Sequence, residues 1–151
     1  MGLDMYLSGK KYVKNWNHTP IDKKHTIIVK QGDKEITSIF PITYITYEVG
    51  YWRKANQIHN WFVNNIQEGV DDCKSYYVEI EQLKELRDLV EKVLADHKLA
   101  DELLPNTPGF FFGSTEYDKY YFEDLEETKE ILDKIIENDT GLFEYEYYSS
   151  W

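Results

Sequence analysis

Residues 51–62 hold the side chains best suited to bind a small polar ligand. Arg53 supplies a planar guanidinium that suits phosphate or carboxylate, and Asn56 and Asn60 supply amides that can bond to a base or a ribose. Asparagine is a poor helix former, so several of them in one helix need a reason other than propensity. We therefore predict that this face of the helix lines a pocket. The alternative is a polar surface face with no special role.

Aromatic side chains and a histidine adjoin this polar face. Trp52 and Trp61 would stack on a planar ligand. His59 lies at the border of the apolar stripe of the helix, where a structural histidine anchored by a hydrogen bond is as reasonable as a general base. If His59 is a base, an aspartate such as Asp118 or Asp72 would be its helper.

Residues 109–114 read Gly-Phe-Phe-Phe-Gly-Ser and form the second distinctive segment. Alternate side chains of a strand point in opposite directions, so we expect Phe110 and Phe112 to pack inward. Phe111 would then face a ligand or a partner. This segment is expected to form the wall of the pocket opposite residues 51–62.

The residues that follow could complete that wall. Ser114, or Thr115, is expected to cap a helix whose free N–H groups would suit an anion, although an ordinary N-cap explains the residue equally well. Tyr117 and Asp118 add an aromatic ring and a carboxylate. The predicted ligand-binding residues are Trp52, Arg53, Asn56, His59, Asn60, Trp61, Phe111, Ser114, Tyr117 and Asp118.

The sequence predicts no catalytic set, no metal site and no cofactor. Asp71 and Asp72 are adjacent, and two adjacent carboxylates point apart in most backbones, which does not suit a metal ion. Cys73 has no histidine at a diagnostic spacing, as a cysteine nucleophile would need. It is the single cysteine, so a disulfide within the chain is impossible.

The elements that position these residues follow from the periodicity of the chain. Strand patterns cover residues 1–13 (interrupted at 8–11), 25–29, 35–40, 42–52 and 142–148. Helical patterns cover residues 54–68, 80–96 and about 115–138. Residues 70–77 are expected to be a connection. Because strands and helices are segregated, we predict an α+β fold, with a mostly antiparallel sheet and about three helices packed on one face. Residues 1–151 are expected to form a single domain, in which residues 15–40 are a loop or hairpin insert.

Composition restricts the partners. The net charge is −11 and the pI is about 4.8, which argues against a nonspecific binder of DNA or RNA. No apolar run approaches the length of a membrane span, and the first residues lack the apolar core of a signal peptide. We therefore expect a cytoplasmic protein that binds neither a nucleic acid polymer nor a membrane.

Three segments together resemble a family of small cytosolic proteins found in phages, prophages and bacteria. They are Met-Gly-Leu-Asp-Met-Tyr-Leu at residues 1–7, Tyr-Trp-Arg-Lys-Ala-Asn-Gln-Ile-His-Asn-Trp-Phe at residues 51–62, and Gly-Phe-Phe-Phe-Gly-Ser at residues 109–114, followed by Tyr117 and Asp118. The family offers no catalytic residues to transfer. The resemblance implies a phage accessory protein and, by analogy with small phage proteins, one that sequesters a nucleotide immune signal of the host.

Three hypotheses result. The first is a protein that binds a nucleotide-like small molecule without catalysis, for which a homodimer is a reasonable assembly. The second is an enzyme acting on such a molecule, with His59 as the base. The third is an inhibitor that binds another protein through an acidic, tyrosine-rich surface.

Overall fold

The computed structural model describes residues 2–36 and 39–151, and within these ranges it has an α+β fold, as predicted. The strands are β1 (Asp4–Tyr12), β2 (Lys30–Gln31), β3 (Lys34–Glu35), β4 (Tyr44–Arg53), β5 (Tyr76–Val78) and β6 (Phe143–Ser150). The α-helices are α1 (Asn56–Asn65), α2 (Ile80–Ala95), α3 (Ala100–Leu103) and α4 (Lys119–Asn138). Short 3-10 turns are η1 (Ile21–Lys23) and η2 (His97–Leu99).

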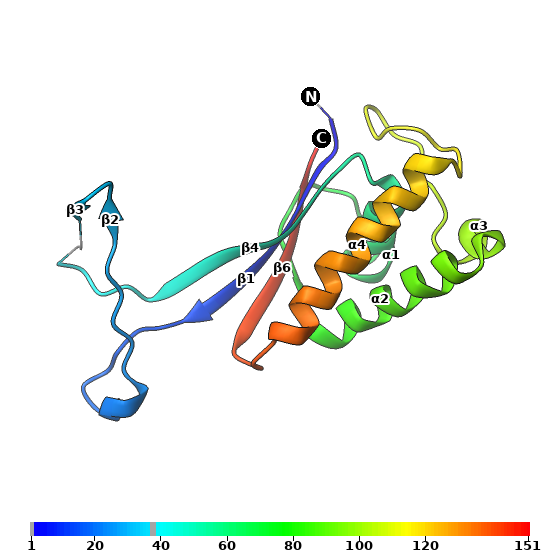
Figure 1. Ribbon diagram of the computed structural model, residues 1–151. Helices are drawn as coiled ribbons and strands as arrows, with labels where there is room; N and C mark the ends of the chain where they lie inside the picture. Colours follow the sequence, from blue (N-terminus) through cyan, green and yellow to red (C-terminus); the bar gives the residue numbers. More distant parts are fainter. Residues whose placement is uncertain (1, 37–38) are drawn as a thin grey trace.

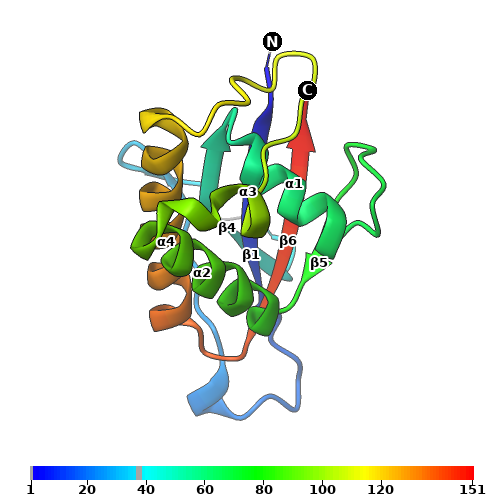
Figure 2. The same cartoon turned by 90° about the vertical axis from the view of Figure 1, so that its right-hand side faces the viewer.

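In the described part of the chain, β4, β1, β6 and β5 form one antiparallel sheet in that order, with the helices on one of its faces (Figures 1 and 2). The central strand is β1. Its residue Asp4 lies opposite Arg53 of β4 on one side and opposite Ser150 of β6 on the other. The two termini therefore lie at the same end of the sheet (Figure 1).

Strand β1 shows why the alternating pattern predicts this sheet. Met5 and Leu7 are fully buried beneath the helices, while Tyr6 points to the uncovered face. The predicted interruption at residues 8–11 does not break the strand, which continues to Tyr12. The pairing with β4 shifts register between Leu7 and Ser8, so the irregularity is a bulge.

The helices close over the sheet through apolar stripes. Trp52 of β4 is buried and donates its indole N–H to Thr128 of α4 (Nε1 to Oγ1, 2.9 Å). Gly50 permits this close approach, because a Cβ atom there would lie 2.9 Å from Cγ2 of Ile131. Residues of α2 and α4 complete this layer: Leu83, Leu86, Val90, Val93, Leu125, Leu132 and Ile135.

Several boundaries differ from the predictions. The hairpin turn at residues 31–34 is present, but β2 and β3 are two residues long instead of covering residues 25–29 and 35–40. Thr37 and Ser38, in the second predicted strand, and Met1, in the first, lie outside the described residues. Tyr76 and Tyr77, at the end of the predicted connection of residues 70–77, instead belong to the edge strand β5, because this segment pairs with β6.

Within the described ranges, no helix is both long and apolar enough to cross a membrane.

Candidate functional site

The structure distributes the predicted site residues between two pockets, the core and the surface. Arg53, Asn56, Ser114 and Asp118 lie around the first pocket, and His59 and Asn60 lie around the second. We name these the Arg53 pocket and the His59 pocket. The Arg53 pocket has a volume of about 240 Å³ and is lined by Arg53, Lys54, Asn56, Gln57, Asn106, Gly113, Ser114, Glu116, Asp118, Tyr120, Tyr121 and Asp124.

Asn56, the first residue of α1, is buried and shapes the wall of the Arg53 pocket. Its side-chain oxygen accepts from the Thr107 backbone N–H at 2.9 Å. Its amide nitrogen donates to the carbonyl oxygens of Ser114 at 2.8 Å and Phe112 at 3.2 Å. These bonds use both amide hydrogens and one lone pair of the amide oxygen, so Asn56 holds the loop of residues 105–118 against α1.

Two cationic side chains lie at one side of the Arg53 pocket, where β4 ends and the chain turns into α1. Arg53 is exposed, and its Nε lies 3.9 Å from the Asp4 carboxylate, which is the limit of an ion pair. Lys54 makes the turn with φ of 60°, and its side chain passes beside Gly113. Arg53 and Lys54 could therefore meet an anionic group together.

Asp124 of α4 supplies a carboxyl group to the same pocket. Gln57 donates from Nε2 to its Oδ2 at 3.2 Å. Burial, together with the smaller effect of the neighbouring carboxylates Glu127 and Asp118, raises the pKa of Asp124 to about 6, and the bond from Gln57 opposes this shift. The sequence contains a signal for this residue that we missed, because Asp124 falls within the apolar stripe formed by Tyr121 and Leu125.

The His59 pocket, of about 330 Å³, lies on the other side of the loop of residues 105–118. It is lined by His59, Asn60, Val63, Asp71, Thr107, Pro108, Gly109, Phe110, Phe112 and Trp151. Asn60 donates to the Pro105 carbonyl at 3.2 Å and accepts from Asn64 at 3.0 Å. It too holds the loop.

His59 is fully buried, and both of its ring nitrogens have partners among the described residues. Nε2 lies 2.9 Å from Oδ2 of Asp71, and Nδ1 lies 2.7 Å from the Tyr147 hydroxyl. When a neutral His59 ring faces a carboxylate, its proton lies on Nε2, and in that tautomer Nδ1 accepts from the Tyr147 hydroxyl. The Trp151 indole N–H donates to the other oxygen of Asp71 at 3.1 Å.

This network links α1, the chain that follows it and the central part of the sheet. Tyr147 stacks on Phe62 with ring centroids 3.9 Å apart, and burial raises its pKa well above the ordinary value, so the hydroxyl keeps its proton. The expected helpers of His59 are engaged elsewhere. Asp118 caps α4 by accepting from the Tyr121 N–H, and Asp72 accepts from the Tyr76 hydroxyl.

The predicted stacking tryptophans lie in the hydrophobic core and line neither pocket. Trp52 of β4 is buried beneath α4, where it bonds to Thr128, and Trp61 is buried because α1 is enclosed by the sheet on one side and by residues 105–118 on the other. The buried part of α1 is therefore wider than the single buried stripe of a helix that is covered on one face only.

The phenylalanines do not alternate as a strand would, because residues 109–112 form a turn. The Phe112 N–H bonds to the Gly109 carbonyl, and Phe111 has φ of 64°. Phe112 is buried, Phe111 is partly exposed, and Phe110 is exposed instead of packing inward. Phe111 lines neither pocket.

The helix predicted to begin near Ser114 begins at Lys119, with Asp118 as its N-cap. The Ser114 hydroxyl instead accepts from the Glu116 N–H at 3.1 Å. No helix N-terminus therefore stands at Ser114 in the described chain, and the anion site expected there does not form. Tyr117 packs edge-on against Tyr121, and its hydroxyl lies 3.4 Å from the Asn106 nitrogen.

Comparisons of the chain with family models, with characterised proteins and with solved structures found no match.

Proposed function

We propose that this protein is a phage-type accessory protein that binds a small nucleotide-like ligand in the Arg53 pocket without chemical change. Sequestration of a host immune signal is the biological role that such binding would serve. The proposal rests on one arrangement. The pocket is lined by the cationic side chains of Arg53 and Lys54 and also by the half-buried carboxyl group of Asp124.

A nucleotide has chemical groups that match both kinds of charge in this pocket, the cations and the carboxyl group. Its phosphate would bond to the guanidinium of Arg53 and the ammonium of Lys54. A carboxylate accepts two hydrogen bonds side by side, so Asp124 suits the N–H groups on the edge of a base such as guanine. The exposed ring of Tyr120, at the rim of the pocket, is available to stack on the base.

Binding without catalysis is favoured over the enzyme hypothesis by the surroundings of His59. A general base needs one nitrogen directed at the substrate. In the described chain, the two nitrogens of His59 bond to Asp71 and Tyr147. We therefore assign His59 to the support of the fold.

The test is ligand retention. The protein is incubated with 5′-GMP, 5′-AMP, cyclic di-GMP or cyclic GMP–AMP, washed and heat-denatured, and the released nucleotide is identified by chromatography. We expect at least one of these probes to be released intact. Arg53→Ala should weaken its binding at least ~10-fold, because loss of a charge-assisted hydrogen bond costs roughly 1.5–3 kcal/mol.

The matched control is Arg87→Ala. Arg87 lies on α2, outside the pocket, and pairs with Asp133 and Glu91. Its removal should leave binding unchanged. Failure to retain any probe, or equal effects of the two variants, would refute the proposal. Release of an altered nucleotide would favour the enzyme.

A second candidate is the protein-binding inhibitor, because the sheet face without helices carries a row of tyrosines. The ring centroid of Tyr6 lies 5.3 Å from that of Tyr51 and 5.9 Å from that of Tyr148. Such rings give rigid contact area for a protein partner. If this candidate is correct, Tyr6→Ala should abolish inhibition of the partner protein, while Arg53→Ala should leave that inhibition intact.

A further inference from the structure

Residues 14–36 and 39–43, which we name the arm, leave the body of the protein between β1 and β4 and carry β2 and β3 away from the helices (Figure 1). None of its described residues, 14–36 and 39–43, is buried. In the described chain, β2 and β3 pair with each other and not with the main sheet. An isolated two-stranded hairpin is at best marginally stable in water, so this arm lacks the burial that normally stabilises one.

The arm nevertheless carries large apolar side chains. Ile21 and Ile39 are 89% and 94% exposed. Trp16, Ile28, Val29 and Ile36 are exposed as well. Apolar side chains gathered on an exposed segment mark an interaction site more often than a free surface.

The arm also differs in charge from the rest of the chain. Residues 14–43 contain five lysines and three acidic residues, for a net charge of +2. The remainder contains 12 basic and 25 acidic residues, for a net charge of −13. A cationic arm on an acidic protein is attracted to acidic surfaces, including those of an identical chain.

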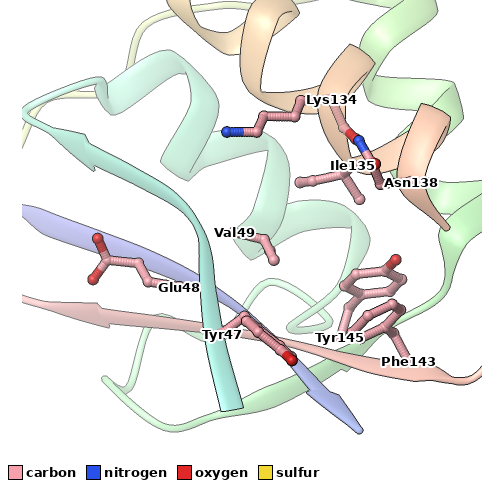
Figure 3. Close-up of a pocket in the computed structure, with 8 residues that line it drawn as sticks. All are labelled: Tyr47, Glu48, Val49, Lys134, Ile135, Asn138, Phe143 and Tyr145. Atoms are coloured by element: carbon pink, nitrogen blue, oxygen red, sulfur yellow. The ribbon is translucent and has the colours of Figure 1, made fainter. Parts of the chain in front are cut away.

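An apolar groove on the body offers a complementary surface. It lies between β4, β6 and the last turns of α4, and its volume is about 340 Å³ (Figure 3). We name it the Phe143 groove, and its lining residues are Tyr47, Glu48, Val49, Lys134, Ile135, Asn138, Phe143 and Tyr145. Residues 123–146, which supply most of this lining, contain ten acidic residues and two lysines.

We propose that the arm of one copy of this chain docks on the Phe143 groove of a second copy, forming a homodimer. The apolar side chains of the arm cover the rings of Tyr47 and Phe143, and its lysines face the carboxylates around the groove. The contact is reciprocal, since each copy has one arm and one groove, so a two-fold dimer closes without exposing a further copy of either surface. This assembly does not depend on the Arg53 pocket.

The test is the mass of the full-length protein in solution, measured by sedimentation equilibrium over a wide range of concentration. We expect a reversible dimer of twice 18.0 kDa. The arm variant Ile28→Asp/Ile39→Asp and the groove variant Tyr47→Lys should each be monomeric. Val70→Asp is the matched control, because Val70 is also exposed but lies on neither surface, and it should remain dimeric.

Mixing the arm variant with the groove variant distinguishes the contact of arm and groove from other modes of dimerisation. Neither variant alone can form the contact, but a mixed pair retains one intact groove and one intact arm. The mixture should therefore form a weaker heterodimer. Because attraction between charges is screened by salt, raising NaCl should increase the dissociation constant of the wild-type dimer on the order of 10-fold.

Four outcomes would overturn the proposal: a monomer at every concentration, a dimer that survives both variants, a mixture that stays monomeric, or a monomer that co-sediments with anionic lipid vesicles. Circular dichroism should show that all variants are folded, as expected for side chains that are at least partly exposed. Nucleotide retention by the monomeric variants should be unchanged, so failure here and failure of the ligand proposal are distinguishable.

Discussion

His59 illustrates how a residue that could do chemistry is used to hold a fold together. Its two nitrogens link Asp71, in the chain after α1, to Tyr147, in β6. A histidine, a carboxylate and a hydroxyl in series are also the components of a nucleophilic triad. Here the hydroxyl belongs to a fully buried tyrosine, which no substrate can reach.

Tyr147→Phe tests this structural role. The variant keeps the stacking on Phe62 but leaves Nδ1 of His59 buried without a donor, which costs roughly 1–3 kcal/mol. Urea denaturation should show a lower midpoint with an unchanged m-value. The control is Tyr145→Phe on the same strand, which removes a bond to the partly buried Asp139 and should cost less. Equal losses in the two variants would contradict the role assigned to His59.

The ionisation of Asp124, in the Arg53 pocket, makes the stability of the folded protein depend on pH. Its pKa is about 6 in the folded protein against 3.8 for an unperturbed aspartate. The folded state therefore binds this proton more tightly, and the free energy of unfolding falls as the pH rises from about 4 through about 6.

Asp124→Asn should remove this loss. The variant should be more stable than the wild type at pH 7.5 by roughly 1 kcal/mol after allowance for solvent screening, or about 2–4 °C in Tm, and equally stable near pH 3.5. Thermal denaturation at the two pH values measures this. Asp133→Asn on the same helix should have the opposite effect at pH 7.5, because Lys129 and Arg87 lower the pKa of Asp133. If Asp124→Asn is less stable than the wild type at pH 7.5, the ionised carboxylate of Asp124 stabilises the folded protein in spite of its burial.

At the scale of elements, the loop of residues 105–118 forms a boundary of both pockets and is held by side chains of α1. Asn56 and Asn60 bond to its backbone, and Gly113 passes close to Lys54. The two asparagines that suggested a ligand on α1 are therefore explained by a segment of the chain itself.

Gly113→Ala should loosen this loop. Gly113 has φ of 93°, and a Cβ atom there would lie 3.2 Å from the carbonyl oxygen of Lys54. Gly69→Ala is the matched control, because its φ is 79° and no atom lies within 4 Å of the added Cβ. Both variants carry backbone strain of roughly 1–2 kcal/mol, and Gly113→Ala should cost roughly 1 kcal/mol more. Chemical denaturation and hydrogen exchange in residues 105–118 would measure the difference. Equal costs for the two variants would mean that the loop shifts to accommodate the added methyl group.

The sequence predicts the long elements well because their periodicity extends over many residues. It predicts β1, β4, β6, α1, α2 and most of α4. It does not predict β5, because three residues show no period and their conformation depends on pairing with β6. The start of α4 was wrong because Ser114 and Asp118 are both good N-caps, and only the packing of the following residues selects Asp118.

The site was predicted less completely for a related reason. Four of the predicted residues do surround one pocket, which shows that residue type and spacing carry information about proximity. The partners of Asn56 are backbone carbonyls and an N–H of a distant loop, and these leave no mark in the sequence. Helical spacing likewise could not show that α1 is covered on two sides, which is why Trp61 was assigned to the pocket. Trp52 was assigned to it because the sequence does not show that α4 covers this end of β4.

At the scale of the whole molecule, stability depends on the apolar side chains that are buried between the sheet and the helices and not on those that are exposed. Leu7→Ala, in the middle of the central strand, should cost roughly 2–5 kcal/mol by leaving a cavity under the helices. Leu142→Ala, at a residue that is 64% exposed, should change stability by less than about 0.5 kcal/mol. Urea denaturation would measure both values. A small loss for Leu7→Ala would mean that the sheet is not the centre of the cooperative unit.

Because β1 lies in the middle of the sheet, the sheet can be completed only late in the synthesis of the chain. As the ribosome makes the chain, β1 emerges long before β6, yet the two strands pair along almost their whole length. Until β6 is released, β1 has β4 on one side and an open edge on the other. Pairing between such distant segments is slow. The nascent chain is therefore exposed to aggregation and to chaperones until synthesis of β6 is finished.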